Sequence, residues 1–110
     1  MKKAGTHDLY LVDRNQTIYD CLLKFEQNNV GTLLVTNDVK IVGSATDGDI
    51  RKALLKSRSL GTVVGQIMNT EYLFALSDAE CAGYFDKYEY ISLIPVVNSR
   101  RELQSIFLRY

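Results

Sequence analysis

Apolar side chains recur along the first half of the chain with two different spacings, which predict different elements. Between Thr17 and Asn28 they fall three and four positions apart, the pattern of an amphipathic helix. Residues 32–36 and 39–45 are short apolar runs rich in β-branched side chains, with Asn37 and Asp38 between them. They predict two strands joined by a tight turn.

A second helix is expected after this strand pair, from Thr46 to near Arg58 and Ser59. It carries acidic residues in its first turn and basic residues later, which is the charge order that the helix dipole favours. Each expected helix begins with a threonine and has an aspartate three positions on, a pair that can form reciprocal bonds across the first turn. These pairs are Thr17 with Asp20 and Thr46 with Asp49.

The second half of the chain follows the same plan. We expect a turn at 65–69, a strand at 72–76, a helix capped by Ser77 with Glu80 in a further capping box, and strands at 91–97 and 102–108 around a turn at 98–101.

The two halves also match in sequence. Residues 17–21 match 77–81 at an offset of 60, and residues 35–37 match 96–98 at an offset of 61. We interpret this as an internal duplication, although any helix followed by two strands would give a similar match. Two such units, each with one bare sheet face, would stack to share a core.

Composition excludes several classes of function. A chain of 110 residues makes one compact domain or two half-size repeats. Its 13 basic side chains balance 13 acidic ones, so we expect no nucleic-acid partner. The apolar runs are too short for a membrane span and no signal peptide is recognisable, so we expect a cytoplasmic protein without a membrane partner.

The reactive residue types offer little chemistry. Cys21 and Cys81 lie inside apolar helical patterns, where a thiol behaves as a buried hydrophobe. His7 has no second ligand candidate nearby, so we expect no metal site. Apart from Asp47 and Asp49 there is no pair of titratable groups for acid and base catalysis. We therefore expect no catalytic residue, and an enzyme is the weakest of three hypotheses.

The first hypothesis, a regulatory module that binds a ligand, comes from a family resemblance. The segment GTLLVTNDVKIVGSATDGDIRKALL resembles the core of a CBS repeat, in which two strands lead into the signature G-h-x-T-x-x-D, here Gly43 to Asp49. IPVVNSRRELQSIF resembles the strand pair of a second repeat. The resemblance implies an α/β (α+β) fold of tandem repeats, each a small sheet with helices packed on one face, related by pseudo-twofold symmetry. We expect the first repeat, with its lead-in, at 1–60 and the second at 61–110, truncated before its last helix.

The same resemblance implies an adenine-nucleotide site. Thr46 would donate its hydroxyl to the ligand and Asp49 would accept from the ribose hydroxyls, while Gly43 would let the backbone approach the ligand closely. By analogy, the base pocket would be lined by Gln16, Val30, Gly31 and Ser44.

General physical chemistry supports the site less sharply. The start of the second helix would present unpaired amides to a phosphate. A carboxylate at Asp47 disfavours a highly charged ligand, which favours AMP over ATP among the nucleotides AMP, ADP and ATP. Thr46 and Asp49 are also an ordinary capping box, and this structural interpretation can hold together with the functional one.

The second repeat departs from the signature. At an offset of 61, Gln104, Phe107 and Tyr110 stand where the first repeat has Gly43, Thr46 and Asp49, so at most one signature is competent. Without a last helix, residues 103–108 would be less covered, which favours a homodimer. The aromatic residues near the end of the expected helix suggest core and rim packing more than a base-stacking platform. They are Tyr84, Phe85, Tyr88 and Tyr90.

The segment TDGDIRKALLKSRSLGTVVGQIMN resembles CBS pairs attached to sugar-phosphate enzymes. Two settings fit, the N-terminal regulatory half of sugar-1-phosphate nucleotidyltransferases and the C-terminal half of arabinose-5-phosphate isomerases. Because Met1 opens the module directly, we favour the first, with a catalytic domain after residue 110. The prediction is a non-catalytic regulatory module that binds an AMP-like nucleotide; the alternative is a ligand-free structural dimerisation module.

Overall fold

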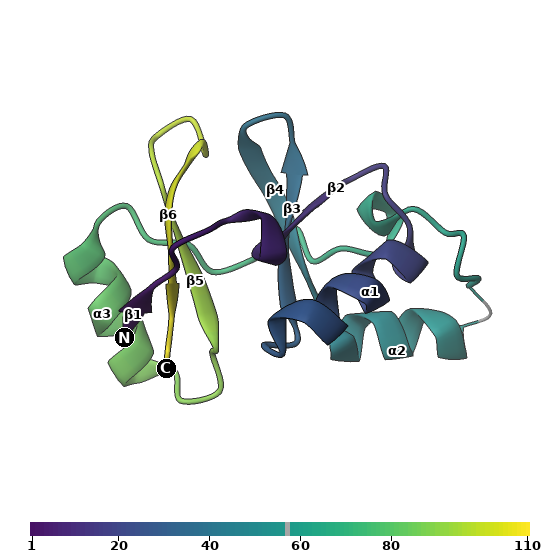
Figure 1. Cartoon of the computed structure of the whole chain (residues 1–110). Coiled ribbons are helices and arrows are strands. Elements are labelled where there is room, and N and C mark those ends of the chain that lie inside the picture. The colour runs from purple at the N-terminus through teal and green to yellow at the C-terminus, as the bar shows by residue number, and fades with distance from the viewer. Residues whose placement is uncertain (57) are drawn as a thin grey trace.

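Two three-stranded sheets stand side by side in the middle of the molecule, with α1 and α2 outside the first sheet and α3 outside the second (Figure 1). The computed structural model describes residues 1–56 and 58–110. Each sheet is covered by helices on its outer side, so the predicted fold of two stacked repeats is confirmed.

The first half contains the elements that its apolar spacing predicts. Its sheet has the order β2-β3-β4, with β3 parallel to β2 and antiparallel to β4. The elements are β2 (Leu11–Asp13), α1 (Ile18–Asn28), β3 (Thr32–Asn37), β4 (Lys40–Thr46) and α2 (Asp47–Leu55), with a short 3-10 turn, η1 (Asp8–Tyr10), before β2.

Helix α2 is shorter than expected, because it ends at Leu55 rather than near Arg58 and Ser59. The amides of Lys56 and Arg58 both donate to the carbonyl of Ala53, which closes the last turn. Residue 57 lies outside the described part of the chain.

The second sheet takes one of its strands from the opposite end of the sequence. Its order is β1-β6-β5, and all neighbours are antiparallel. The strands are β1 (Lys2–Lys3), β5 (Leu93–Val97) and β6 (Leu103–Leu108), and α3 (Asp78–Lys87) packs on this sheet. A 3-10 turn, η2 (Val64–Gln66), lies where a turn was predicted.

The predicted strand at 72–76 is wrong. Ala75 makes a single parallel bridge to Val96, through the bonds Ala75 N to Pro95 O and Val97 N to Ala75 O, both 2.9 Å. The next rung of a parallel ladder would need an N–H group from Pro95, and proline has none. In the first half the corresponding residue is Leu34, which pairs with Leu11, so the strand β2 forms there.

The predicted capping box at Ser77 is half formed. Ser77 Oγ accepts from the Glu80 amide at 3.1 Å, but Glu80 Oε1 accepts from the Leu76 amide at 3.2 Å and not from Ser77. The Glu80 carboxylate therefore holds the residue before the cap and not the cap residue itself. At Thr17 the box with Asp20 is complete, as predicted.

The two halves meet across an approximate twofold axis. The Ile41 amide donates to the Arg101 carbonyl at 2.9 Å, and the Leu103 amide donates to the Val39 carbonyl at 3.2 Å. These bonds are reciprocal, since each joins one hairpin to the turn of the other. Figure 1 shows the two hairpin turns at the same end of the molecule.

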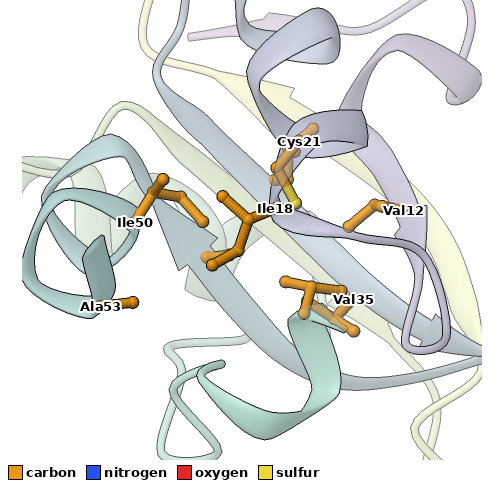
Figure 2. Packing of buried hydrophobic residues seen from close by; sticks show 9 residues of the cluster. Val12, Ile18, Cys21, Val35, Ile50 and Ala53 are labelled. Atoms are coloured by element: carbon orange, nitrogen blue, oxygen red, sulfur yellow. The ribbon is translucent and has the colours of Figure 1, made fainter. Parts of the chain in front are cut away.

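Strand alternation divides the buried residues into three layers. The outer layer of the first half joins α1 and α2 to the sheet, through residues such as Ile18, Ile50 and Val35 (Figure 2). The middle layer lies between the sheets, and Leu34 of β3 faces Ile106 of β6 there. The third layer, between the second sheet and α3, completes a core that both halves share.

Strand β6 is well covered, contrary to expectation. Ile106 is fully buried and Phe107 is 6% exposed. Ile106 belongs to the layer between the sheets and Phe107 to the layer under α3, while β1 pairs along the other edge of β6. An exposed face on 103–108 therefore gives no reason for association. Along the described residues, no helix has both the length and the apolar character needed to cross a bilayer.

Candidate functional site

The predicted pair Thr46 and Asp49 forms the cap of α2. Thr46 ends β4, and its Oγ1 accepts from the Asp49 amide at 3.1 Å. Asp49 Oδ2 in turn accepts from the Thr46 amide at 3.0 Å. The Thr46 hydroxyl keeps its proton for donation and the second Asp49 oxygen keeps its lone pairs, so both side chains can still bind a ligand.

These two side chains border a cavity of about 250 Å³ at the seam between the halves. The first half contributes the ends of β3 and β4 and the start of α2, while the second half contributes the segment before α3 and the segment that leads into β5. The wall consists of Thr32, Leu34, Ser44, Thr46 and Asp49 on one side and Asn69, Tyr72, Leu73, Tyr90, Ile91, Ser92, Leu93 and Pro95 on the other.

Ser44, which the family resemblance suggested for the base pocket, lies in this wall with Thr46 and Asp49. Its backbone exchanges two hydrogen bonds with Asn69, at 2.9 and 2.8 Å, which fix the rim of the cavity. Tyr72 supports the same wall from the second half, because its hydroxyl donates to the Ile41 carbonyl at 2.7 Å. The polar groups that could orient a ligand are therefore held by both halves.

The other three predicted residues lie elsewhere. Val30 lines a separate cavity of about 240 Å³. Gly31 has a φ of +72°, and its carbonyl accepts from the Asp47 amide at the start of α2. Gln16 supports the loop before α1, since its Oε1 accepts from the Asp13 amide at 2.9 Å. None of the three is among the residues that line the seam cavity.

Sequence reasoning missed the wall from the second half. Ile91 and Ser92 occupy in the second half the places that Val30 and Gly31 occupy in the first, at the offset of 61. The twofold arrangement brings each of these segments to the signature strand of the other half. The duplication carried this signal, but only the stacked geometry reveals it. Tyr90 lines this wall and is 79% exposed, so it stands at the opening.

The start of α2 offers a phosphate fewer free amides than expected. The Asp47 amide donates to the Gly31 carbonyl at 3.1 Å, and the Asp49 amide is taken by Thr46. The Asp47 side chain is exposed, lies near Gly31 and does not line the cavity, so it does not add a second carboxylate to the site. The expected effect of Asp47 on ligand charge is thereby weakened.

Gly43 has a packing role that the sequence analysis did not predict. A Cβ at this position would lie 2.6 Å from Met68 Sδ and 3.1 Å from the Asn69 carbonyl oxygen. The glycine therefore allows the chain at 68–69 to approach β4. It shapes the rim of the cavity through Asn69 and does not itself line the cavity.

The second signature is displaced by one residue from its expected place. Ile94 pairs with Phe107 as Leu33 pairs with Ala45, which sets Leu108 where the first half has Thr46. The turn of the second hairpin is one residue longer than that of the first, so Phe107 and Tyr110 are not the counterparts of Thr46 and Asp49. The hydroxyl of the signature is absent from the second half in either alignment.

Metal chemistry finds no support in the part of the chain that the structure describes. No group of three His, Cys, Asp or Glu side chains there is placed to hold a metal ion.

Comparison with known families assigns the chain. The family model described as CBS domain matches residues 2–56, which include the signature and both of its strands. The chain belongs to the CBS domain family. No curated protein matches it.

Several solved structures share the fold of this chain. A CBS domain protein from Streptococcus pneumoniae is 18% identical, with 97% of this chain and 74% of that chain covered and a TM-score of 0.76. OpuCA from Staphylococcus aureus is 17% identical, with 90% and 84% covered and a TM-score of 0.71. The CBS domain pair of the protein MJ0100, solved with 5'-methylthioadenosine and S-adenosyl-L-methionine, is 26% identical, with 89% and 82% covered and a TM-score of 0.69.

Proposed function

We propose that this CBS pair binds an adenine-type nucleotide, AMP-like in size, in the seam cavity and transmits binding as a regulatory signal without catalysing a reaction. The observation that carries the proposal is that Thr46 and Asp49 border a cavity whose opposite wall comes from the other half. A ligand there contacts both repeats, so it favours the arrangement of the halves that fits it best.

The chemistry of the wall suits a nucleoside. Leu34, Leu93 and Pro95 offer apolar surface to a base, while Ser44 and Asn69 offer polar groups that can orient it. Asp49 has an oxygen free to accept from ribose hydroxyls. The CBS pair of MJ0100, which is similar to this chain, binds two adenosine-containing ligands.

The test is isothermal titration of AMP, ADP, ATP and CMP into the wild type, Asp49→Ala and Asp20→Ala. Asp20 makes the same two cap bonds in α1 that Asp49 makes in α2, so its variant controls for loss of a helix cap. We expect an adenine nucleotide to bind more tightly than about 1 mM, with binding lost only in Asp49→Ala. Binding that is absent in the wild type, or equal in both variants, contradicts the proposal.

We propose further that the module regulates a sugar-phosphate enzyme, with a sugar-1-phosphate nucleotidyltransferase as the catalytic domain of the parent chain. The support is the resemblance of residues 46–69 to CBS pairs of such enzymes. Sequencing the reading frame downstream of the codon for residue 110 tests this. A nucleotidyltransferase in frame is the expected result, and a stop codon or an unrelated domain contradicts it.

A homodimer is the remaining part of the proposal, and the outer faces of α1 and α2 support it. Tyr19 and Leu23 lie one turn apart on α1 and are about half exposed, and Leu55 at the end of α2 is 81% exposed. The Tyr19 amide bonds to the Leu60 carbonyl, so Leu60 extends the same face. Covering this apolar surface favours association.

Sedimentation with and without AMP separates the two functions. A dimer that Leu23→Arg with Leu55→Arg converts to a monomer supports this face as the interface, whereas a monomeric wild type contradicts the dimer. A stable dimer that binds no nucleotide favours the purely structural module.

A further inference from the structure

A second, basic groove adjoins the seam cavity along α2. Four polar side chains line a hollow of about 280 Å³ there: Lys52 of α2, its C-cap residue Lys56, Arg58 after it, and Gln66 of η2. Asp49 also lines this hollow. We call this hollow the basic groove.

Asp49 lines both the basic groove and the seam cavity, so the two hollows adjoin at this residue. Residues 49, 52 and 56 fall three and four positions apart, so they follow one face of α2. On the facing side, Gln66 and Ile67 border the groove and Asn69 borders the cavity. One face of α2 and the segment at 66–69 therefore contribute to the walls of both spaces.

The charge of the groove suits a phosphate group. Three cationic side chains face one carboxylate, and the Gln66 amide adds neutral donors. Guanidinium and ammonium groups form the strongest hydrogen bonds of proteins with phosphate oxygens. The Arg58 amide is bonded to the Ala53 carbonyl at 3.1 Å, which holds the backbone of Arg58 beside α2.

A phosphate on a nucleotide in the seam cavity has few other partners. The wall of that cavity includes no lysine or arginine among the described residues. The amides of Asp47 and Asp49 at the start of α2 are already bonded. Arg109 lines the cavity that Val30 borders, but its guanidinium donates to the carbonyls of Phe85, Tyr88 and Ile91.

We propose that the basic groove binds a phosphate group, so that a nucleotide with its nucleoside in the seam cavity extends past Asp49 onto Lys52, Lys56 and Arg58. This extension rests on the nucleotide site proposed above, whereas the affinity of the groove for phosphate does not. The competing explanation is that basic residues near the C-terminal end of α2 only stabilise the helix through its dipole. That role would change stability and leave every ligand affinity unchanged.

The experiment compares adenosine, AMP, ADP and inorganic pyrophosphate by isothermal titration. The proteins are the wild type, the double variant Lys52→Gln with Arg58→Gln, and the charge-matched control Lys2→Gln with Lys3→Gln on the exposed strand β1. We expect the wild type and the control to bind ADP at least about tenfold more tightly than adenosine, and the groove variant to lose this gain while it binds adenosine normally. The gain should also shrink at high salt.

The titration of pyrophosphate shows whether the groove binds a phosphate carried by a nucleotide or free phosphate. It also distinguishes failure of the nucleotide-site proposal from failure of the groove proposal. Pyrophosphate that binds the wild type, competes with ADP and fails to bind the groove variant supports a phosphate carried by the nucleotide. Pyrophosphate that binds together with adenosine, when ADP shows no gain, supports a site for free phosphate. If adenosine does not bind but pyrophosphate does, the nucleotide site fails and the groove stands. If the groove variant keeps both the ADP gain and the pyrophosphate affinity, the groove proposal is wrong.

Discussion

Asp49 bonds back to Thr46 through the same two hydrogen bonds by which Asp20 bonds back to Thr17, so the chain contains one helix cap at the seam cavity and a twin on the outer helix α1. Comparing the two caps separates helix capping from ligand binding, two roles that the sequence alone does not distinguish at Thr46 and Asp49. Both caps stabilise the start of a helix, but only Thr46 and Asp49 also line the cavity. The Thr17 hydroxyl makes one further hydrogen bond, to Asp20 Oδ2 at 3.1 Å.

The first prediction concerns the contribution of the two threonine caps to the free energy of unfolding. Thr46→Ala and Thr17→Ala each remove the acceptor for the N3 amide, and each should lower the free energy of unfolding by about 1 kcal/mol. Urea unfolding followed by circular dichroism measures both. A loss at Thr46 far above the loss at Thr17 would mean that the signature threonine has a structural role beyond capping.

Gly43 provides a second prediction. In Gly43→Ala the added methyl group meets Met68 and the backbone of Asn69, so the segment at 68–69 must move and the protein should lose about 1 to 3 kcal/mol of stability.

The matched control is Gly83→Ala in α3. Gly83 has open space around its Cβ position, and alanine favours a helix over glycine by about 0.5 to 1 kcal/mol, so this variant should be more stable than the wild type. Thermal unfolding of both variants checks the opposite signs. Equal effects would show that the close approach at Gly43 does not limit the fold.

Tyr72 ties the two halves together beside the cavity. Its buried hydroxyl donates to the Ile41 carbonyl and accepts from Arg101 Nη1 at 3.2 Å. Tyr72→Phe leaves that carbonyl without its partner and should cost about 1 to 2 kcal/mol, measured by urea unfolding. Tyr19→Phe is the control, since Tyr19 is 52% exposed, and it should change stability little. The idea fails if the two variants are equally stable.

The two cysteines predict a loss of stability in alkali. Burial, helped by the charge of Asp20, raises the pKa of the Cys21 thiol to about 11 from its ordinary 9.0, and burial with the charge of Asp78 raises the pKa of Cys81 likewise to about 11. The folded state therefore keeps both protons after the unfolded chain has lost them. Stability should be intact below pH 9 and decline as the pH rises from about 9 to 11.

Urea unfolding between pH 7 and pH 10.5 measures this decline, and Cys21→Ala with Cys81→Ala should show a shallower one. Iodoacetamide should also modify the native thiols far more slowly than the unfolded ones at pH 8.5. Rapid modification of both thiols in the native protein would contradict their burial.

Local signals predicted the first half of the molecule well. The two threonine caps and the apolar spacing located α1, β3, β4 and the start of α2, because each signal lies within the element that it specifies. The same kind of signal failed at 72–76, where a short run of aromatic and aliphatic residues suggests a strand. The missing N–H of Pro95, in another strand, prevents the ladder from extending.

For the candidate site too, the sequence predicted the residues that lie close together along the chain and missed those that only the tertiary structure brings near. Ser44, Thr46 and Asp49 sit on one strand and one helix turn, so their proximity could be predicted from the sequence. Their partners at 90–93 could not, since only the stacking of two sheets brings them near. One extra residue in the second hairpin turn also displaced the expected counterparts of Thr46 and Asp49, a difference that the match at 35–37 and 96–98 does not reveal.

Lys2 pairs with Leu108, at nearly opposite ends of the sequence. Strand β1 cannot take its place until β6 has left the ribosome, and in the meantime β6 has no neighbour on that edge. Closing so long a loop is slow compared with forming the local hairpins. The last step of folding should therefore be the docking of the first strand, with the outer edge of β6 open to other chains until it occurs.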